Sequence, residues 1–363
     1  KYPNREASSF GPLHVVKSSR CRERSMSRII LIAIICPTIF LSAIAAFAAD
    51  YKITHLEQSR VFAGTTLLAD MSDPSEPKVV EVDFDGTVLW KFTPPRSMSG
   101  DILDAAKLAN GNVLITVRDS GIYEIRRDGR VVWGHEDSGA SHDADRLPNG
   151  NTLYNRGWQD KGDDVVREID PEGKIVWAWT GLADYDREPF EDIDVHGWMH
   201  VNSVSRLANG NTLVSMRNFN TVAEVGQNGR VVRSWTFRGK DRRSGLKTRG
   251  EIKGQRNHEP EILKNGNMLL ALRRPNRFVE FNLETQEIVW SWKHPDGNSE
   301  LRTNREANRL PNGNTLGSAG NKLIEIAPDG TIVWQMLAPS GSDNHRKFHK
   351  AIRIGTDGKA YGG

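Results

Sequence analysis

Four histidines lie within two residues of the same position in a frame that recurs along this sequence. The position lies seven residues before the Asn of an Asn-Gly turn, and His142 and His258 occupy it in two copies. His200 and His349 lie two residues and one residue before it in two other copies. A neutral imidazole is a nucleophile, and near neutral pH it also serves as a general acid or base. One such histidine is usually only hydrogen-bonded, but four in one frame predict a shared chemical site.

Arginines and asparagines accompany these histidines. The frame position in the other copies holds Leu103, Asn202, Arg305 and Lys350. In a two-residue hairpin this position pairs with the residue eight after the turn Asn. The expected pairs are Leu103 with Arg118, Asn202 with Arg217, and His258 with Arg273. Arg156 falls one residue short of the partner of His142.

Clustered Arg, His and Asn side chains form a pocket rich in hydrogen-bond donors. Such a pocket suits an anion with several oxygens: a sulfate ester, a phosphate ester or a carboxylate. The residues that we expect to bind this anion are His142, Asn202, Arg217, Asn257, Asn304, Arg118 and Arg156. His and Asp around an axis could also ligate a metal, but no helical H-x-x-x-H or E-x-x-H spacing exists and the arginines would repel a cation. We therefore expect no metal.

The elements that position these residues are copies of one repeat. Its turn occurs as LANGN (108–112), LPNGN (147–151), LANGN (207–211), LKNGN (263–267), LPNGN (310–314) and, in altered form, GTDGK (355–359). Short runs of β-branched and aromatic residues flank each turn, bounded by Gly, Asn, Asp or Pro. Four antiparallel strands in about 45 residues are typical of a propeller blade. The first strand of a blade lines the axis, so the histidines are expected at one mouth of a central channel.

The two ends of the repeat region complement each other. Segments 65–71, 78–83 and 87–92 match strands two to four of a blade, whereas 349–354 matches only strand one. We therefore predict an all-β fold: a six-bladed β-propeller of four-stranded blades, closed by N- and C-terminal strands that share one blade. Closure removes open sheet edges. An open solenoid and a seven-bladed ring are the alternatives.

Tryptophan recurs on the fourth strand of most blades, as Trp90, Trp133, Trp177, Trp290 and Trp334. Large aromatic side chains bury much area between sheets. We interpret these residues as packing between blades, because the outer strand lies far from the axis.

The first fifty residues have the pattern of a leader. Residues 26–48 combine a basic start, an apolar run over 29–47 and an A-x-A site before Ala49. This pattern predicts a cleaved signal peptide and a periplasmic or secreted protein, with the propeller over 49–363. Residues 1–25 are interpreted as an upstream segment foreign to the native protein. The alternative is an uncleaved anchor, the one case in which we expect contact with a membrane.

Charge and cysteine content exclude several function classes. The net charge is +3, but residues 1–48 carry +5 of it, which leaves −2 for residues 49–363. This balance gives no argument for binding nucleic acid. The two cysteines, Cys21 and Cys36, both precede the predicted cleavage site. The mature chain therefore has no disulfide, no cysteine-zinc site and no cysteine nucleophile.

Three stretches of the chain resemble the bacterial arylsulfate sulfotransferases and their shorter arylsulfotransferase-like relatives. They are HDADRLPNGNTL (142–153), GWMHVNSVSRLANGNTLVSMRN (197–218) and QRNHEPEILKNGNMLLALRRPNRFVEFN (255–282). The W-M-H-V-N-S part is fairly specific, whereas the Asn-Gly-Asn turns alone are weak signals. The resemblance covers about 49–363 and implies a six-bladed propeller of the PQQ-like type.

The resemblance implies an exported enzyme that moves a sulfuryl group from an aryl sulfate to a phenol without a cofactor. The family uses axial histidines and an arginine. His200 and His258 match these histidines by motif. The arginine is ambiguous among Arg273, Arg274 and Arg277, of which we take Arg273 and Arg274 as catalytic and Arg277 as substrate-binding. His349 is the only histidine on a later inner strand and is the candidate nucleophile.

Two other function classes stay open on the sequence. A non-catalytic propeller that binds a sulfated or acidic ligand, or a protein partner, would explain the Arg, His and Asn residues equally well. An enzyme needs a nucleophile near His200 and His258, whereas a binding protein does not. A quinone-dependent dehydrogenase would share the repeated D-G-x-V-x-W ends, but such propellers have eight blades. The sequence does not specify the donor, the acceptor or the oligomeric state.

Overall fold

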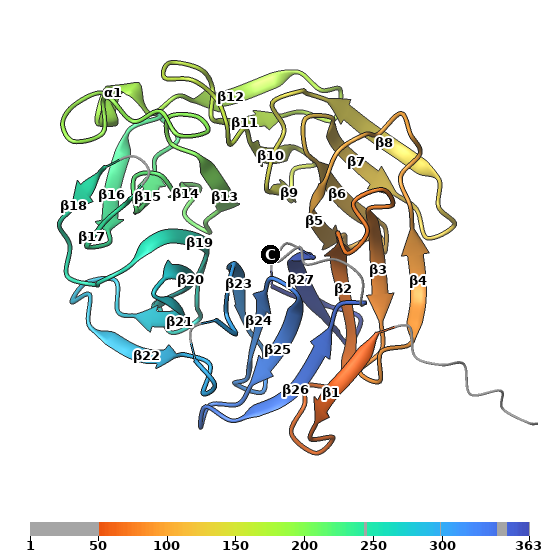
Figure 1. Cartoon of the computed structure of the whole chain (residues 1–363). Coiled ribbons are helices and arrows are strands. Elements are labelled where there is room, and N and C mark those ends of the chain that lie inside the picture. Colours follow the sequence, from red (N-terminus) through yellow and green to blue (C-terminus); the bar gives the residue numbers. More distant parts are fainter. Residues whose placement is uncertain (1–50, 243–244, 298, 340–346, 363) are drawn as a thin grey trace, which may run out of the picture. The chain divides into compact units, whose positions relative to one another are not determined.

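The computed structural model describes residues 51–242, 245–297, 299–339 and 347–362. Their strands form six antiparallel sheets arranged as a ring (Figure 1). The predicted six-bladed propeller is therefore confirmed. The predicted leader lies outside the described residues, and the domain boundaries stay a prediction. None of the described segments forms a helix long and apolar enough to cross a membrane.

Each sheet runs from an inner strand to an outer strand. Blade 1 contains β27 (Phe348–Gly355), β2 (Gly64–Asp70), β3 (Lys78–Val82) and β4 (Val88–Phe92). Blade 2 contains β5 (Ile102–Lys107), β6 (Val113–Val117), β7 (Gly121–Ile125) and β8 (Val131–Glu136). Blade 3 contains β9 (Ala144–Arg146), β10 (Thr152–Asn155), β11 (Val166–Ile169) and β12 (Ile175–Trp179).

The other three blades follow the same order. Blade 4 contains β13 (Val201–Arg206), β14 (Thr212–Met216), β15 (Thr221–Val225) and β16 (Val231–Thr236). Blade 5 contains β19 (Gln255–Ile262), β20 (Met268–Arg274), β21 (Asn276–Phe281) and β22 (Ile288–Trp292). Blade 6 contains β23 (Asn304–Arg309), β24 (Thr315–Ala319), β25 (Lys322–Ile326) and β26 (Ile332–Leu337). Smaller elements are α1 (Leu182–Tyr185), the hairpin β17 (Gly239–Lys240) and β18 (Lys247–Thr248), and β28 (Ala360–Tyr361) beside β27.

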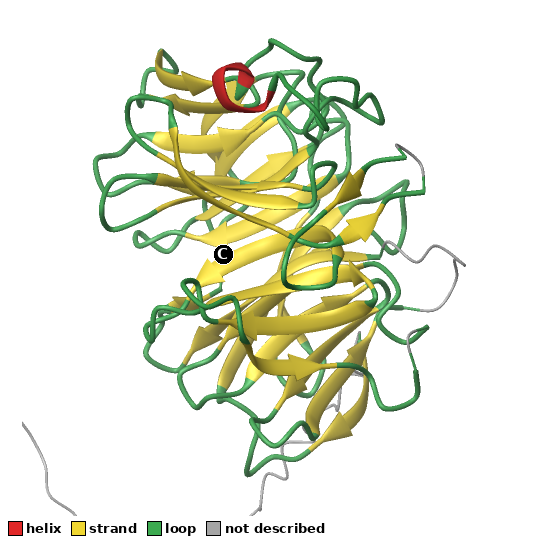
Figure 2. Ribbon diagram, turned by 90° about the vertical axis from the view of Figure 1, so that its left-hand side faces the viewer, coloured by secondary structure: helices red, strands yellow, loops and turns green. Residues whose placement is uncertain are grey.

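The ring closes as predicted, through a blade that both ends of the repeat region build. β27 pairs with β2, with Leu67 opposite Ile352. One further strand was not foreseen: β1 (Lys52–Leu56) pairs with β26 as a fifth strand of blade 6. The N-terminal part of the described chain is therefore hydrogen-bonded to blades 1 and 6. Figure 2 shows the ring of blades from the side, with the short helix α1 at the periphery.

A cluster of polar residues joins each blade to the next. In blade 6, Glu325 accepts hydrogen bonds from Asn314 of its own turn and from Arg353 of blade 1. Arg353 also lies over the Trp334 ring, at 4.8 Å from its centroid. Trp334 in turn donates its indole N–H to the backbone oxygen of Phe84 in blade 1, at 2.8 Å. The equivalent Arg–Trp pairs are Arg146–Trp133, Arg206–Trp177 and Arg309–Trp290. The predicted packing role of the outer-strand tryptophans is thus confirmed for these blades.

The register of the inner hairpins differs from the expected one by two residues. The Asn-Gly turns are three-residue loops, because Leu147 N–H bonds to Asn151 O and Gly150 N–H bonds to Leu147 O. A β-bulge then inserts one extra residue in the inner strand, as at Leu103 between the pairs Ile102–Val117 and Asp104–Thr116. The expected pairs of Arg118, Arg217 and Arg273 were therefore wrong. Their neighbours across the hairpin are Asp101, His200 and Arg256.

Candidate functional site

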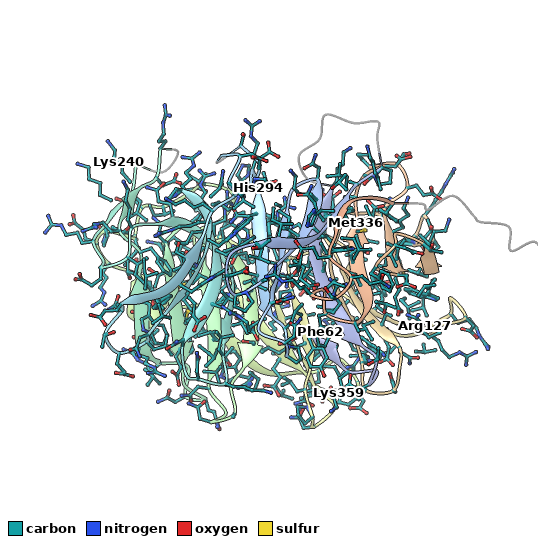
Figure 3. The ribbon with its side chains drawn as sticks, turned by 90° about the horizontal axis from the view of Figure 1, so that it is seen from below. Phe62, Arg127, Lys240, His294, Met336 and Lys359 are labelled. Carbon is teal, nitrogen blue, oxygen red and sulfur yellow. The ribbon has the colours of Figure 1, made fainter. Side chains whose placement is uncertain are left out.

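A cavity of about 650 Å³ lies at the N-terminal ends of the inner strands. The connections that precede β19 and β23 contain Lys240 and His294, and both lie on one face of the ring (Figure 3). Phe62 and Lys359 lie toward the opposite face. We call the face that carries Lys240 and His294 the mouth face.

The cavity collects most of the predicted histidines and arginines. The predicted residues that line it are His142, His200, His258, His349, Arg118, Arg217 and Arg273. They come from five different blades, so only the closed ring brings them together.

Bulges in the inner strands aim these side chains at the axis. In blade 1, the pairs Leu68–Ala351 and Asp70–Phe348 leave His349 and Lys350 together opposite Ala69. A regular strand would send two consecutive side chains to opposite faces. The bulge instead lets His349 line the cavity while Lys350 is buried close beneath it. A similar irregularity falls at Arg305, which also lines the cavity.

The histidine rings lie close together in the cavity. The His142 ring centroid is 5.2 Å from that of His200 and 5.6 Å from that of His349. Trp158 packs beside them, with its ring centroid 4.7 Å from His142 and 5.5 Å from His200. The group therefore forms one cluster of aromatic rings rather than isolated side chains.

His200 is held on both ring nitrogens. Its Nδ1 lies 3.1 Å from the backbone oxygen of His196, which can accept the Nδ1 proton. Arg217 Nη1 lies 2.9 Å from His200 Nε2 and can donate to it. A guanidinium has no lone pair to offer, so this geometry favours neutral His200 with its proton on Nδ1. His200 therefore orients Arg217 rather than presenting a free nitrogen.

His258 and His349 differ from His200, because each has a buried nitrogen without a hydrogen-bond partner. These atoms are Nε2 of His258 and Nδ1 of His349. Buried polar atoms are nearly always hydrogen-bonded, and exceptions call for a functional explanation. Both residues line the cavity, although the two nitrogen atoms are themselves buried.

The environment keeps all four imidazoles neutral. Burial lowers the pKa of His142, His200, His258 and His349 well below the usual range, and nearby positive charges lower it further. For His349 the largest of these charges is Arg305, and for His258 it is Arg273. A neutral imidazole keeps the lone pair that a nucleophile or general base needs.

The charge of the cavity wall favours an anion. Four arginines line it, namely Arg118, Arg217, Arg273 and Arg305, against the two carboxylates Asp101 and Asp119. Arg118 forms ion pairs with both carboxylates. The other three arginines act on the histidines, whose pKa values they lower.

Six predicted site residues do not line the cavity. Arg156 is ion-paired with Asp137 at 3.0 Å, Arg277 donates to the backbone oxygen of Lys253, and Arg274 is exposed. Asn202, Asn257 and Asn304 are buried and donate to backbone or hydroxyl oxygens of neighbouring blades. These short amides satisfy oxygens between two sheets rather than facing the cavity, and their contact with an anion stays a prediction. Of the three candidates Arg273, Arg274 and Arg277, only Arg273 lines the cavity.

The cavity also contains residues that were not selected from the sequence. Trp158 and His196 belong to connections that the repeat frame does not cover. The second strand of a blade returns to the mouth face, so extending the frame two residues past Arg156 would have found Trp158. Arg305 did occupy the frame position but was left out of the selected residues. Among the described residues, no three His, Cys, Asp or Glu side chains are placed to hold a metal ion.

Comparisons with known proteins agree with this architecture. Residues 50–238 match a family model described as arylsulfotransferase (ASST), and residues 151–341 match a second family model with the same description. No curated protein matches the sequence. A protein of unknown function from Bacteroides caccae is similar in structure, with a TM-score of 0.56, 19% identity, and coverage of 80% of this chain and 98% of that chain. A streptogramin B lyase is also similar, with a TM-score of 0.51, 13% identity, and coverage of 87% and 96%. At these identities the two structures support the fold alone.

Proposed function

The chain belongs to the arylsulfotransferase family, and from that premise we propose that its histidine cavity transfers a sulfuryl group from an aryl sulfate to a phenol through a histidine. The observation that carries this proposal is the pair of unpartnered nitrogens on His258 and His349 in a cavity lined by arginines. The substrates are small molecules: one aryl sulfate donor and one phenolic acceptor.

We assign His349 as the nucleophile. A hydrogen bond with the backbone of Leu103 engages the His349 ring, while Nδ1 is buried and unpartnered. In the first half-reaction Nδ1 attacks the sulfur of the donor. The new N–S bond forms as the bond from sulfur to the aryl oxygen breaks, and phenolate leaves with the electron pair.

His258 is assigned as the general base of the second half-reaction. Its unpartnered Nε2 takes the proton of the acceptor phenol while the phenol oxygen attacks the sulfur and the N–S bond breaks. The proton then passes to solvent or to the phenolate released earlier, so the overall reaction balances. At rest His258 is neutral and lacks the acidic second proton of an imidazolium. Donors whose phenolates leave without protonation should therefore react fastest.

Arg217, Arg273 and Arg305 are assigned to the sulfuryl oxygens. Negative charge redistributes over these oxygens as the S–O bond breaks, and fixed cationic donors stabilise it most in a site that excludes water. His200 orients Arg217 through the 2.9 Å contact of Nη1 with Nε2. His142 lies between the His200 and His349 rings and completes the wall.

Trp158 provides the surface on which we expect the aryl group to stack. Its ring is partly exposed, lines the cavity and lies beside His142 and His200. Trp158→Leu should raise KM for the aryl sulfate about ten-fold, because aromatic pairs contribute about 0.5–1.5 kcal/mol beyond area burial. Steady-state kinetics would measure this change, with kcat altered much less. Trp290→Leu, at an outer strand, is the matched control and should leave KM unchanged; an unchanged KM for Trp158→Leu would contradict the assignment.

The pH dependence follows from the direction of the histidine shifts. Since burial and arginines lower the pKa of His258 and His349, acidification through the usual histidine pKa of about 6.5 does not protonate them. We expect kcat/KM to stay level from about pH 8 to below pH 6.5. A pH–rate profile with one strongly acidic phenol as leaving group would show this. An acid limb centred at or above pH ~6.5 would mean that the reacting histidines have ordinary pKa values.

We also propose export to the periplasm or the medium, on the signal pattern of residues 26–48. N-terminal sequencing after expression in a bacterium should find a chain that starts at Ala49. An intact leader in the membrane fraction would favour the anchor instead.

Release of phenol from a chromogenic aryl sulfate, with and without a phenolic acceptor, tests the proposed function. We expect slow release without acceptor and several-fold faster release with it, accompanied by sulfation of the acceptor. If a broad set of aryl sulfates gives no turnover with the folded protein, the transfer proposal is wrong.

A further inference from the structure

Buried charged residues adjoin the residues that line the histidine cavity, and we call these charged residues the layer. In five inner segments the residue that lines the cavity is followed by a charged, buried residue. These pairs are Leu103–Asp104, His142–Asp143, His258–Glu259, Arg305–Glu306 and His349–Lys350. Lys350 is the only cation among the second members of these pairs, and only 3% of its side chain is exposed.

Lys350 joins four blades at one point. Its Nζ lies 2.6 Å from Asp143 Oδ1, 2.9 Å from Glu259 Oε1 and 3.6 Å from Asp104 Oδ1. Lys350 belongs to blade 1, whereas the three carboxylates belong to blades 3, 5 and 2. One ammonium therefore ties together segments that meet only across the axis.

The same carboxylates also fix the next blade around the ring. Asp104 accepts the backbone N–H of Ala144, and Asp143 accepts that of Val204 at 2.7 Å. Glu306 accepts the backbone N–H of Ala351, the residue after Lys350. Displacement of one carboxylate would therefore move two inner strands, including the residues that precede them in the cavity.

The charge balance of the layer depends on Lys350. Burial raises the pKa of Asp104 to about 6 and that of Glu306 to about 7, although the Lys350 charge lowers both. The carboxylates in turn raise the pKa of Lys350 well above its usual value, so it stays charged. The carboxyl groups that interact with Lys350 are Asp104, Asp143, Asp145, Glu259 and Glu306. The groups that act on His142 and His349 from above include Arg118, Arg217 and Arg305.

We propose that Lys350 is a positioning residue for the sulfuryl transfer: its ion pairs across the axis set the mutual placement of His142, His258 and His349. The inference rests on the proposed function for its kinetic consequence, but the placement itself is a property of the folded chain. Each of these histidines is followed in the chain by a member of the layer, so a movement of the layer also moves the residues that line the cavity. Small displacements of reacting groups lower rates by about a hundred-fold.

The test compares Lys350→Met with Lys322→Met. Lys322 is also a buried lysine, and it pairs with the partly exposed Glu300 at 2.5 Å, but neither residue belongs to the layer or lines the cavity. We expect Lys350→Met to lower kcat about a hundred-fold with KM changed less than about three-fold, and Lys322→Met to leave both unchanged. Unaltered kcat in a folded Lys350→Met protein would overturn the proposal.

A second readout does not depend on turnover. In NMR titrations of the histidine ring nitrogens, His142 and His349 of the native protein should stay neutral to well below pH ~6.5. In Lys350→Met their pKa should rise toward that value, because a neighbouring cation is lost and carboxylates are left unpaired. If the native protein shows no turnover but the ring chemical shifts of these histidines differ in Lys350→Met at a pH where the rings are neutral in both proteins, the proposed function fails and the positioning role stands. If neither pKa nor ring shifts change, the positioning role fails.

Lys350→Arg serves if the methionine variant does not fold. A guanidinium keeps the charge but is planar and longer, so it cannot occupy the place of a compact ammonium among three carboxylates. We expect the histidine pKa values to stay low while kcat falls about ten-fold through misplacement. A Lys350→Arg protein with native kcat and KM would contradict the proposal.

Discussion

Replacement of His349 by asparagine should lower kcat for transfer from an aryl sulfate by at least about a thousand-fold. Asparagine offers no nucleophilic nitrogen, so the covalent route through Nδ1 is lost while the hydrogen bond with Leu103 has a substitute donor. The arginines and Trp158 that bind the donor are untouched, and KM should change little. Single-turnover release of the phenol, followed in the stopped flow, measures the first half-reaction separately.

Two further variants make this prediction specific. His258→Asn should slow acceptor-dependent turnover but leave the first release of phenol largely intact, because the base acts in the second half-reaction. His135→Asn, on the outer strand β8 and outside the cavity, is the control and should retain native kinetics. If His349→Asn keeps more than about a tenth of native kcat, the nucleophile is a different group of the cavity.

Glu325→Ala should lower the free energy of unfolding by about 3–5 kcal/mol. Glu325 and Arg353 are fully buried, and Arg353 Nη2 lies 2.6 Å from Glu325 Oε2. Glu325 also accepts the backbone N–H of Phe62 and the side-chain amide of Asn314. Removal of the carboxylate leaves a buried guanidinium and the Phe62 N–H without this acceptor, and it takes one of two acceptors from the Asn314 amide. Equilibrium unfolding in urea measures the loss.

The repeat provides a matched control for this prediction. Glu124 occupies the same position in blade 2 and pairs with Arg146 at 3.3 Å, but 12% and 18% of these two side chains are exposed. Water can solvate a partly exposed Arg146, so Glu124→Ala should destabilise by about 1 kcal/mol or less. Equal losses in the free energy of unfolding for the two variants would contradict the prediction that burial strengthens the effect of the Glu325–Arg353 pair.

The fold could be predicted from the sequence because its signals are local and repeated. Each Asn-Gly turn fixes a hairpin, and the short alternating runs leave little choice but antiparallel strands. The ring closure followed from the missing first strand before Thr65 and the surplus strand that begins near His349. β1 gave no such signal, because it adds a fifth strand to a blade that is already complete.

The strand register could not be predicted, because no particular residue type marks the extra residue of a bulge. Leu103, Asn202 and Arg305 occupy the extra position in three inner strands and have no common chemistry. A shift of one residue sends a side chain to the other face of the sheet. This is why Asn202 was expected in the cavity, where instead His200 lies.

The location of the candidate site was predicted more reliably than the residues that form it. The repeat frame selected histidines that the structure gathers in one cavity, and their chemical roles stay predictions. The frame could not separate Arg273 from Arg274 and Arg277, since their directions depend on the register of β20 and β21. Nor could it select Trp158, which lies in a connection, or recognise that Lys350 belongs to a buried ion pair rather than to the mouth.

Trapping of the covalent intermediate tests the central claim most directly. The protein would be mixed with an aryl sulfate in the absence of any acceptor, quenched at alkaline pH, digested and analysed by mass spectrometry. We expect a sulfuryl adduct on the His349 side chain that disappears when a phenol is added before the quench, with the sulfate recovered on that phenol. Acceptor-dependent turnover without any histidine adduct would contradict transfer through a histidine.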